Sequence, residues 1–86
     1  MLNYIKTPSG DLIARHLLQR VSHIPKKGVL IKDGYDRMLA YIQIEDDAQA
    51  KQVRDLLNEV LIKGKSARQP DWSFLTAAPF VGKSPK

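Results

Sequence analysis

The sequence predicts one α+β domain with the element order β-α-β-β-α-β, in which four antiparallel strands carry two helices on one face. Two stretches, near residues 12–24 and 45–63, have apolar side chains at helical spacing. Short runs with strand character precede, separate and follow them. A length of 86 residues leaves room for one core and no second domain.

The N-terminal part predicts a strand followed by a helix. Residues 2–6 alternate between two faces, and the turn-forming residues 7–10 follow. From Leu12 onward, apolar side chains recur every three or four residues. Pro8 suits a first helical position, and Pro25 ends the helix because the residue before a proline is disfavoured in helical geometry.

The central part predicts a pair of antiparallel strands. Residues 29–31 form an apolar run that is too short for a helix. The Asp33-Gly34 pair is typical of a tight turn, so residues 37–44 are expected to return beside the first strand. In that return strand the expected core-facing side chains are Met38, Ala40, Ile42 and Ile44. Leu39 and Tyr41 then belong to the opposite, half-open face.

The C-terminal part predicts the second helix and the last strand. Asp46 or Asp47 caps the helix, and Lys63 and Gly64 close it, a cation and a glycine where each is favoured. Residues 72–76 are expected to be the last strand. The predicted domain therefore covers residues 1–76, and residues 77–86 form a tail.

This element order is the ferredoxin-like arrangement, which leaves one face of the sheet open for binding. Arg37, Ala40 and Tyr41 match the basic, small and second aromatic positions of a strand-three motif, and Tyr4 stands at the stacking position of a strand-one motif. In these positions the chain resembles the RNA recognition motif family. Leu39 departs from the family, because it stands where a base-stacking aromatic is usual. The resemblance implies a ferredoxin-like fold and RNA binding on the open face.

The residues also support this reading without the resemblance. Tyr4 and Tyr41 would share the open face, where aromatic rings stack on bases without regard to sequence. Cations are expected to meet the phosphates: Lys6, Lys32 and Arg37 on the sheet, and Lys63, Lys65 and Arg68 after the second helix. We therefore predict a nucleic-acid-binding domain that prefers single-stranded RNA to DNA.

The distribution of charge agrees with a basic binding surface. The net charge is +5, from 14 Lys and Arg against 9 Asp and Glu. Residues 45–62 are acidic, whereas the segments before and after them are basic. If residues 45–62 form a helix, one side of the molecule is acidic and the others are basic.

A protein-interaction or regulatory module is the alternative. Leu2 and Leu39 would form an apolar patch on the open face, and such a patch marks a protein interface, a homodimer contact, or a surface that the chain itself covers. The aromatic C-terminal segment supplies candidates for such a cover: Trp72, Phe74, Pro79 and Phe80.

Other classes of function find little support in the sequence. The chain has no cysteine, which removes thiolate nucleophiles, disulfides and cysteine-based zinc sites. His16 and His23 are about two helical turns apart in the predicted helix, too far to share a metal, and residues 45–47 are explained as a helix start. We expect no enzyme activity, no cofactor, no metal and no membrane span. The cytoplasm is the expected compartment.

Overall fold

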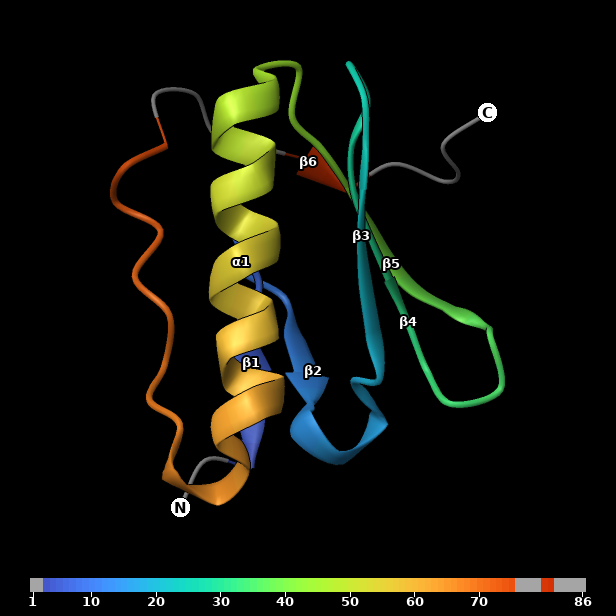
Figure 1. Ribbon diagram of the computed structural model, residues 1–86, viewed down its shortest axis with the longest axis vertical. Coiled ribbons are helices and arrows are strands. Elements are labelled where there is room, and N and C mark those ends of the chain that lie inside the picture. Colours follow the sequence, from blue (N-terminus) through green and yellow to red (C-terminus); the bar gives the residue numbers. More distant parts are fainter. Residues whose placement is uncertain (1–2, 76–79, 82–86) are drawn as a thin grey trace.

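The computed structural model describes residues 3–75 and 80–81 (Figure 1). One α-helix and two antiparallel sheets make up this part of the chain. In chain order the elements are β1 (Tyr4–Lys6), β2 (Leu12–Ala14), the 3-10 turn η1 (Arg15–Leu17), β3 (Arg20–Ile24), β4 (Gly28–Lys32), β5 (Met38–Gln43), α1 (Asp47–Lys63), the 3-10 turn η2 (Gly64–Ser66) and β6 (Phe80–Val81).

The larger sheet has the strand order β3-β4-β5-β6. Val29 pairs with His23 on one side and with Ile42 on the other. Gly28 opens β4 at a positive φ of 141°, and a Cβ atom there would lie against the carbonyl oxygen of Ile42. Only glycine fits this close approach of two strands. The predicted strand at 29–31 and its antiparallel return strand are confirmed, but Met38, expected to face the core, is exposed.

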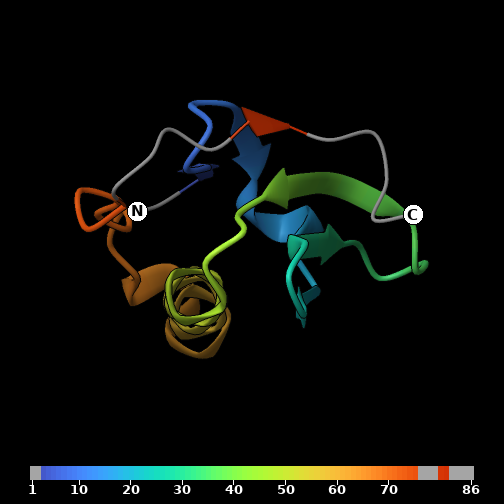
Figure 2. The same cartoon turned by 90° about the horizontal axis from the view of Figure 1, so that it is seen from above.

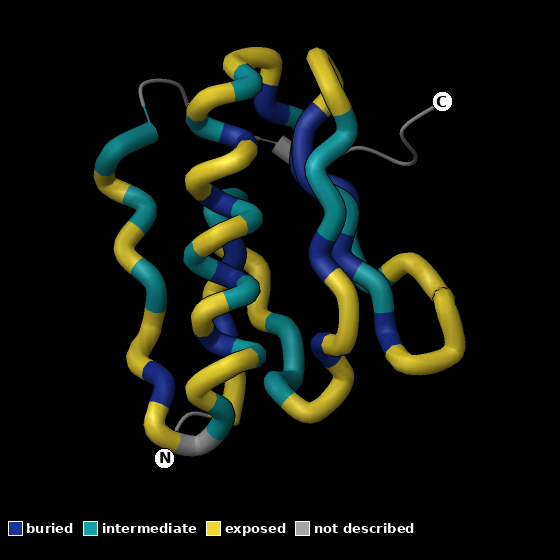
Figure 3. The backbone as a smooth tube through the Cα atoms, viewed as in Figure 1, coloured by how far each residue is buried: buried dark blue, intermediate teal, exposed yellow. Residues whose placement is uncertain are grey.

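Helix α1 has a capping residue at its start, a glycine at its end and one apolar face between them. The Asp46 carboxylate caps it by accepting hydrogen bonds from the amides of Ala48 and Gln49, and Gly64 ends it at a positive φ of 58°. The helix buries one face on β3 and β4 through Ala50, Val53, Leu57 and Val60. Figure 3 shows how buried and exposed residues alternate along the helix. The predicted helix near 45–63 is confirmed, with Asp46 as its cap.

The smaller sheet is a hairpin of β1 and β2, in which Ile5 pairs with Ile13. Ile5 is buried in the same core as the helix stripe. In Figure 1, residues 67–75 run alongside α1 on the side away from β3 and β4, and the view from above shows that they also lie beside β1 (Figure 2). We call residues 67–75 the strap.

The strap is bonded to the outer edge of β1. The Gln69 carboxamide donates to the Tyr4 carbonyl at 2.6 Å and accepts from the Lys6 amide at 3.1 Å. The Trp72 indole donates to the Lys6 carbonyl at 2.7 Å. Gln69 therefore bonds β1 as the peptide group of a neighbouring strand would.

The predicted ferredoxin-like fold is wrong, because residues 12–24 form β2, η1 and β3 rather than a helix. β-Branched residues such as Ile13, Val21 and Ile24 favour strands, and their pairing with β1 and β4 outweighs the helical spacing. Leu17, on the expected apolar stripe, is exposed, while its neighbour Leu18 is buried.

The expected last strand at 72–76 is also wrong over the residues that the structure describes. Trp72–Leu75 form a turn in which the Leu75 amide donates to the Trp72 carbonyl, and Thr76 lies outside the described residues. Trp72 and Phe74 pack against the core with their rings edge to face. The strand that pairs with β5 is instead β6, which falls within the expected tail at 77–86.

Candidate nucleic-acid interface

The residues of the expected open face do not come together. Tyr4 and Lys6 lie on β1, which pairs with β2 and not with β5. Tyr41 lies on β5 but is only 2% exposed, and its hydroxyl donates to the Lys27 carbonyl at 3.1 Å. Leu39 is half-buried against the core. The predicted stacking role of Tyr41 is therefore corrected, because its ring is buried. Leu39, expected on the open binding face, instead packs partly against the core.

Lys32 and Arg37 lie in the β4–β5 hairpin, where each has an acidic partner. Lys32 Nζ is 3.1 Å from Asp36 Oδ1, and Arg37 Nε is 2.9 Å from Asp33 Oδ2. Asp33 also accepts the amides of Tyr35 and Arg37, at 2.9 Å each. The Arg37 amide, with the Tyr35 amide and the Arg37 guanidinium, lowers the pKa of Asp33. These acids partly neutralise the charge that Lys32 and Arg37 offer to a phosphate, although the Arg37 side chain is 72% exposed.

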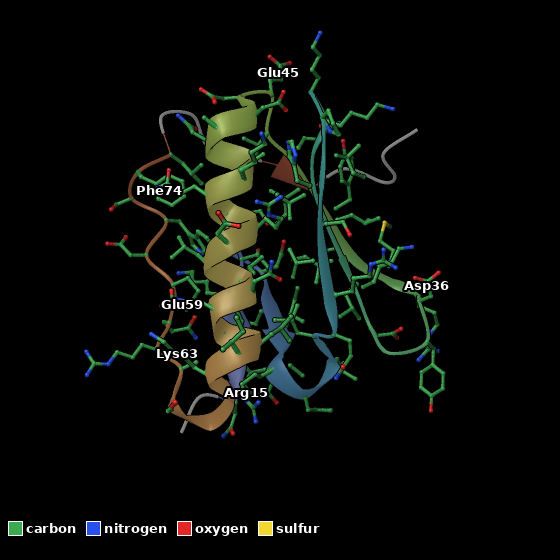
Figure 4. All side chains as sticks on the ribbon, in the orientation of Figure 1. Arg15, Asp36, Glu45, Glu59, Lys63 and Phe74 are labelled. Carbon is green, nitrogen blue, oxygen red and sulfur yellow. The ribbon has the colours of Figure 1, made fainter. Side chains whose placement is uncertain are left out.

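The other predicted residues gather around the C-terminal end of α1. Gln69 bonds β1, so Arg68 at the start of the strap lies close to Tyr4 and Lys6. Lys63 is the last residue of α1, and Lys65 belongs to η2 between Lys63 and Arg68. Figure 4 shows Lys63 and Arg15 toward one end of the molecule and Glu45 at the other.

Two side chains at this end, Arg15 and His16, are missing from the sequence prediction. They lie in η1, directly after β2, and the Arg15 amide donates to the Asn3 carbonyl at 2.9 Å. The signal for this placement is the turn at residues 7–11. A loop of this length with a glycine between two short strands is typical of a hairpin, which brings residue 15 opposite residue 3.

We call this surface the basic end. It contains the exposed Tyr4 ring and Lys6 of β1, Arg15 and the His16 ring of η1, Lys63 of α1 and Arg68 of the strap. Tyr4 and Lys6 share the exposed face of β1, since Ile5 between them points into the core.

Two clefts open on the basic end. The first has a volume of about 280 Å³ and is lined by Asn3, Tyr4, Ala14, Arg15 and His16. The second, of about 210 Å³, lies between α1 and the strap. Its wall contains the cations Lys63 and Arg68 but also the acids Glu59 and Asp71, and Lys63 Nζ is 2.8 Å from Glu59 Oε1. The first cleft has no acid in its lining, so it is the one suited to an anion.

The opposite end of the molecule is acidic where α1 begins. Asp47 Oδ1 accepts the Lys26 amide at 2.7 Å and lies 3.1 Å from His23 Nε2. The Lys26 amide, and then the His23 ring, lowers the pKa of Asp47. Glu45 and Asp46 add two more carboxylates at this end. Three neighbouring carboxylates therefore stand where α1 begins, with Lys26 and Lys51 close to Asp47.

Other kinds of site find no support among residues 3–75 and 80–81. No group of three or more His, Cys, Asp or Glu side chains in this part of the chain is placed to hold a metal ion. Helix α1 is neither long nor apolar enough to cross a membrane. No protein-family model, curated protein or solved structure matches the chain.

Proposed function

We propose that the chain is a nucleic-acid-binding domain that holds single-stranded RNA on its basic end. The observation that carries this proposal is Tyr4, which is 57% exposed on a short strand, shares the exposed face of that strand with Lys6, and lines a cleft with Arg15 and His16. The strand that carries this ring is bonded at both edges, to β2 and to the strap, so the ring is held in place and open to a ligand.

The physical basis is the combination of stacking with charge. An exposed ring stacks on an unpaired base of any sequence, and the cations around it neutralise the phosphates on either side of that base. Double-stranded nucleic acid is a poorer partner, because its bases are already stacked and the ring of Tyr4 cannot reach their faces.

The test compares two charge-matched double variants by fluorescence anisotropy with a short, labelled, single-stranded RNA. Lys6→Gln with Arg68→Gln removes two cations from the basic end, and we expect weaker binding and a salt dependence whose slope falls by about 0.7 for each lost phosphate contact. Lys26→Gln with Lys51→Gln removes the same charge from the acidic end and is expected to leave the slope unchanged. Equal losses in the two variants would mean that only net charge matters, and absence of binding at low salt would end the proposal.

The β4–β5 hairpin supports protein interaction as a second candidate function. Tyr35 is 83% exposed at its tip, with the Arg37 guanidinium 5.2 Å from the ring centre. Met38 at the base of the hairpin is also exposed. Tyrosine, arginine and methionine are enriched in interfaces, and the bonds to Asp33 hold the loop in one shape. Sedimentation at high concentration tests for self-association, and a Tyr35→Ala variant that sediments like the parent at every concentration would argue against a homodimer through this tip.

A further inference from the structure

We infer that the cleft between β1 and η1 binds one nucleotide unit, with its base on the ring of Tyr4 and its phosphate beside Arg15 and His16. This inference rests on the proposed function and makes it specific, because it assigns the ligand of one cleft within the basic end. The unit is either part of an RNA strand or a free mononucleotide, since both present the same base and phosphate.

The cleft exists because a small residue faces a large one. Tyr4 and Ala14 are direct partners in the β1–β2 ladder, so their side chains lie next to each other on the exposed face. The methyl group of Ala14 covers little of the Tyr4 ring, which remains 57% exposed. A longer side chain at position 14 would fill this space.

The lining matches the parts of a nucleotide. The Tyr4 ring offers a flat apolar surface for a base. The Asn3 carboxamide, with both a donor and an acceptor, suits the polar edge of that base. Arg15 brings a positive charge and His16 a ring nitrogen to the cleft, and no Asp or Glu lines it to repel a phosphate. The second cleft lacks this selectivity because Glu59 and Asp71 line it.

The size and stiffness of the cleft favour a single unit. Its volume of about 280 Å³ is at the lower limit of ligand pockets, which run from about 300 Å³ upward. The β1 wall is held by β2 on one edge and by Gln69 and Trp72 on the other. A wall that is already ordered loses little conformational entropy when a ligand binds.

The experiment is a chemical-shift titration of the ¹⁵N-labelled full chain with adenosine 5′-monophosphate, and in parallel with adenosine, inorganic phosphate and a short oligoadenylate RNA. We expect the monophosphate to shift the amides of Asn3, Tyr4, Ala14 and His16. Adenosine or phosphate alone should shift them less at equal concentration, because each provides only half of the ligand. Shifts spread evenly over the surface, or none in these amides, would overturn the inference.

Three variants make the test specific. Tyr4→Ala removes the stacking surface and Ala14→Leu fills the cleft, and each should weaken monophosphate binding at least about fivefold. Tyr4→Phe keeps the ring and should bind like the parent. Tyr35→Ala, the same truncation on the distant hairpin, is the control and should also bind like the parent. Unchanged binding by both Tyr4→Ala and Ala14→Leu would sink the inference.

The two proposals fail in different ways. In one outcome, oligoadenylate binds, the double variant at Lys6 and Arg68 binds it more weakly, and Ala14→Leu changes the binding of neither oligoadenylate nor the monophosphate. The RNA proposal is then supported and the nucleotide cleft is refuted. If the monophosphate shifts the cleft amides but oligoadenylate binds no better than the monophosphate, the cleft stands as a site for a free mononucleotide and the RNA proposal falls. Tighter oligoadenylate binding that Ala14→Leu weakens supports both.

Discussion

Replacing Gln69 with alanine is expected to destabilise the fold by about 1 kcal/mol through β1. The side chain makes two hydrogen bonds with β1, to the Tyr4 carbonyl and from the Lys6 amide. Hydrogen bonds between neutral groups contribute about 0.5–1.5 kcal/mol each, and water replaces part of this because both bonds are exposed. In a domain of 86 residues such a loss lowers the melting temperature by about 4–8 °C.

Urea unfolding and amide hydrogen exchange together test this prediction. Gln69→Ala should lower the unfolding midpoint and remove the protection of the Lys6 amide. Gln69→Glu should be at least as damaging, because it places an oxygen against the Tyr4 carbonyl in place of the amide donor. Gln52→Ala, on the exposed face of α1, is the matched control and should change stability by less than about 0.5 kcal/mol. Full protection of Lys6 in Gln69→Ala would refute the bridging role of Gln69.

Three further predictions concern the stability of the fold. Gly28→Ala should lower the free energy of unfolding in urea by about 3 kcal/mol or more, because its Cβ would clash with the Ile42 carbonyl at a positive φ. Wild-type stability of this variant would contradict the close approach. Leu57→Ala should cost about 2–5 kcal/mol from the cavity it leaves, whereas Ile62→Ala, at an 85% exposed position on the same helix, should be nearly neutral; equal losses would contradict the orientation of α1. Asp33→Asn should be less stable than the parent at neutral pH, because the lowered pKa of Asp33 means that the folded state favours its ionised carboxylate. The difference in unfolding free energy should shrink as the pH falls below the ordinary carboxyl pKa of 3.8. A difference that does not depend on pH would exclude this contribution of the Asp33 charge.

Local chemistry accounts for the elements that the sequence predicts correctly. Asp46 and Gly64 mark the two ends of α1, and each acts on backbone groups within a few residues of itself. Asp33 likewise holds the turn between β4 and β5 by accepting the amides of Tyr35 and Arg37, while Asp36, and not Gly34, takes the positive φ. Such signals can be read from a single sequence because the interacting groups are neighbours along the chain.

The region 12–24 shows why periodicity alone misleads. The spacing of Ile13, Leu17, Val21 and Ile24 fits a helix, but three of these four residues are β-branched. Pairing with β1 and β4 then decides the structure, and strand pairing over this distance leaves no local signal. Because this region forms strands, β1 pairs with β2 and not with β5. Tyr4 and Tyr41 therefore lie in different sheets and not on one shared face.

The hydrogen bonds between Gln69 and β1 stabilise the fold and also bring the strap to the basic end. A change at Gln69 should therefore affect both stability and RNA binding. Position 69 is 65 residues from Tyr4 in the chain, yet its carboxamide fixes the start of the strap, and with it Arg68, next to the exposed ring. Gln69 is neutral and leaves the net charge unchanged when replaced, so a purely electrostatic surface would bind RNA equally well without it. We expect Gln69→Ala to bind single-stranded RNA several-fold more weakly than Gln52→Ala at a temperature where both variants are fully folded, because Arg68 is then no longer held near the Tyr4 strand. Equal affinity of the two variants in anisotropy measurements would show that Tyr4 and Arg68 act independently, and the basic end would then be a diffuse charge rather than a built site.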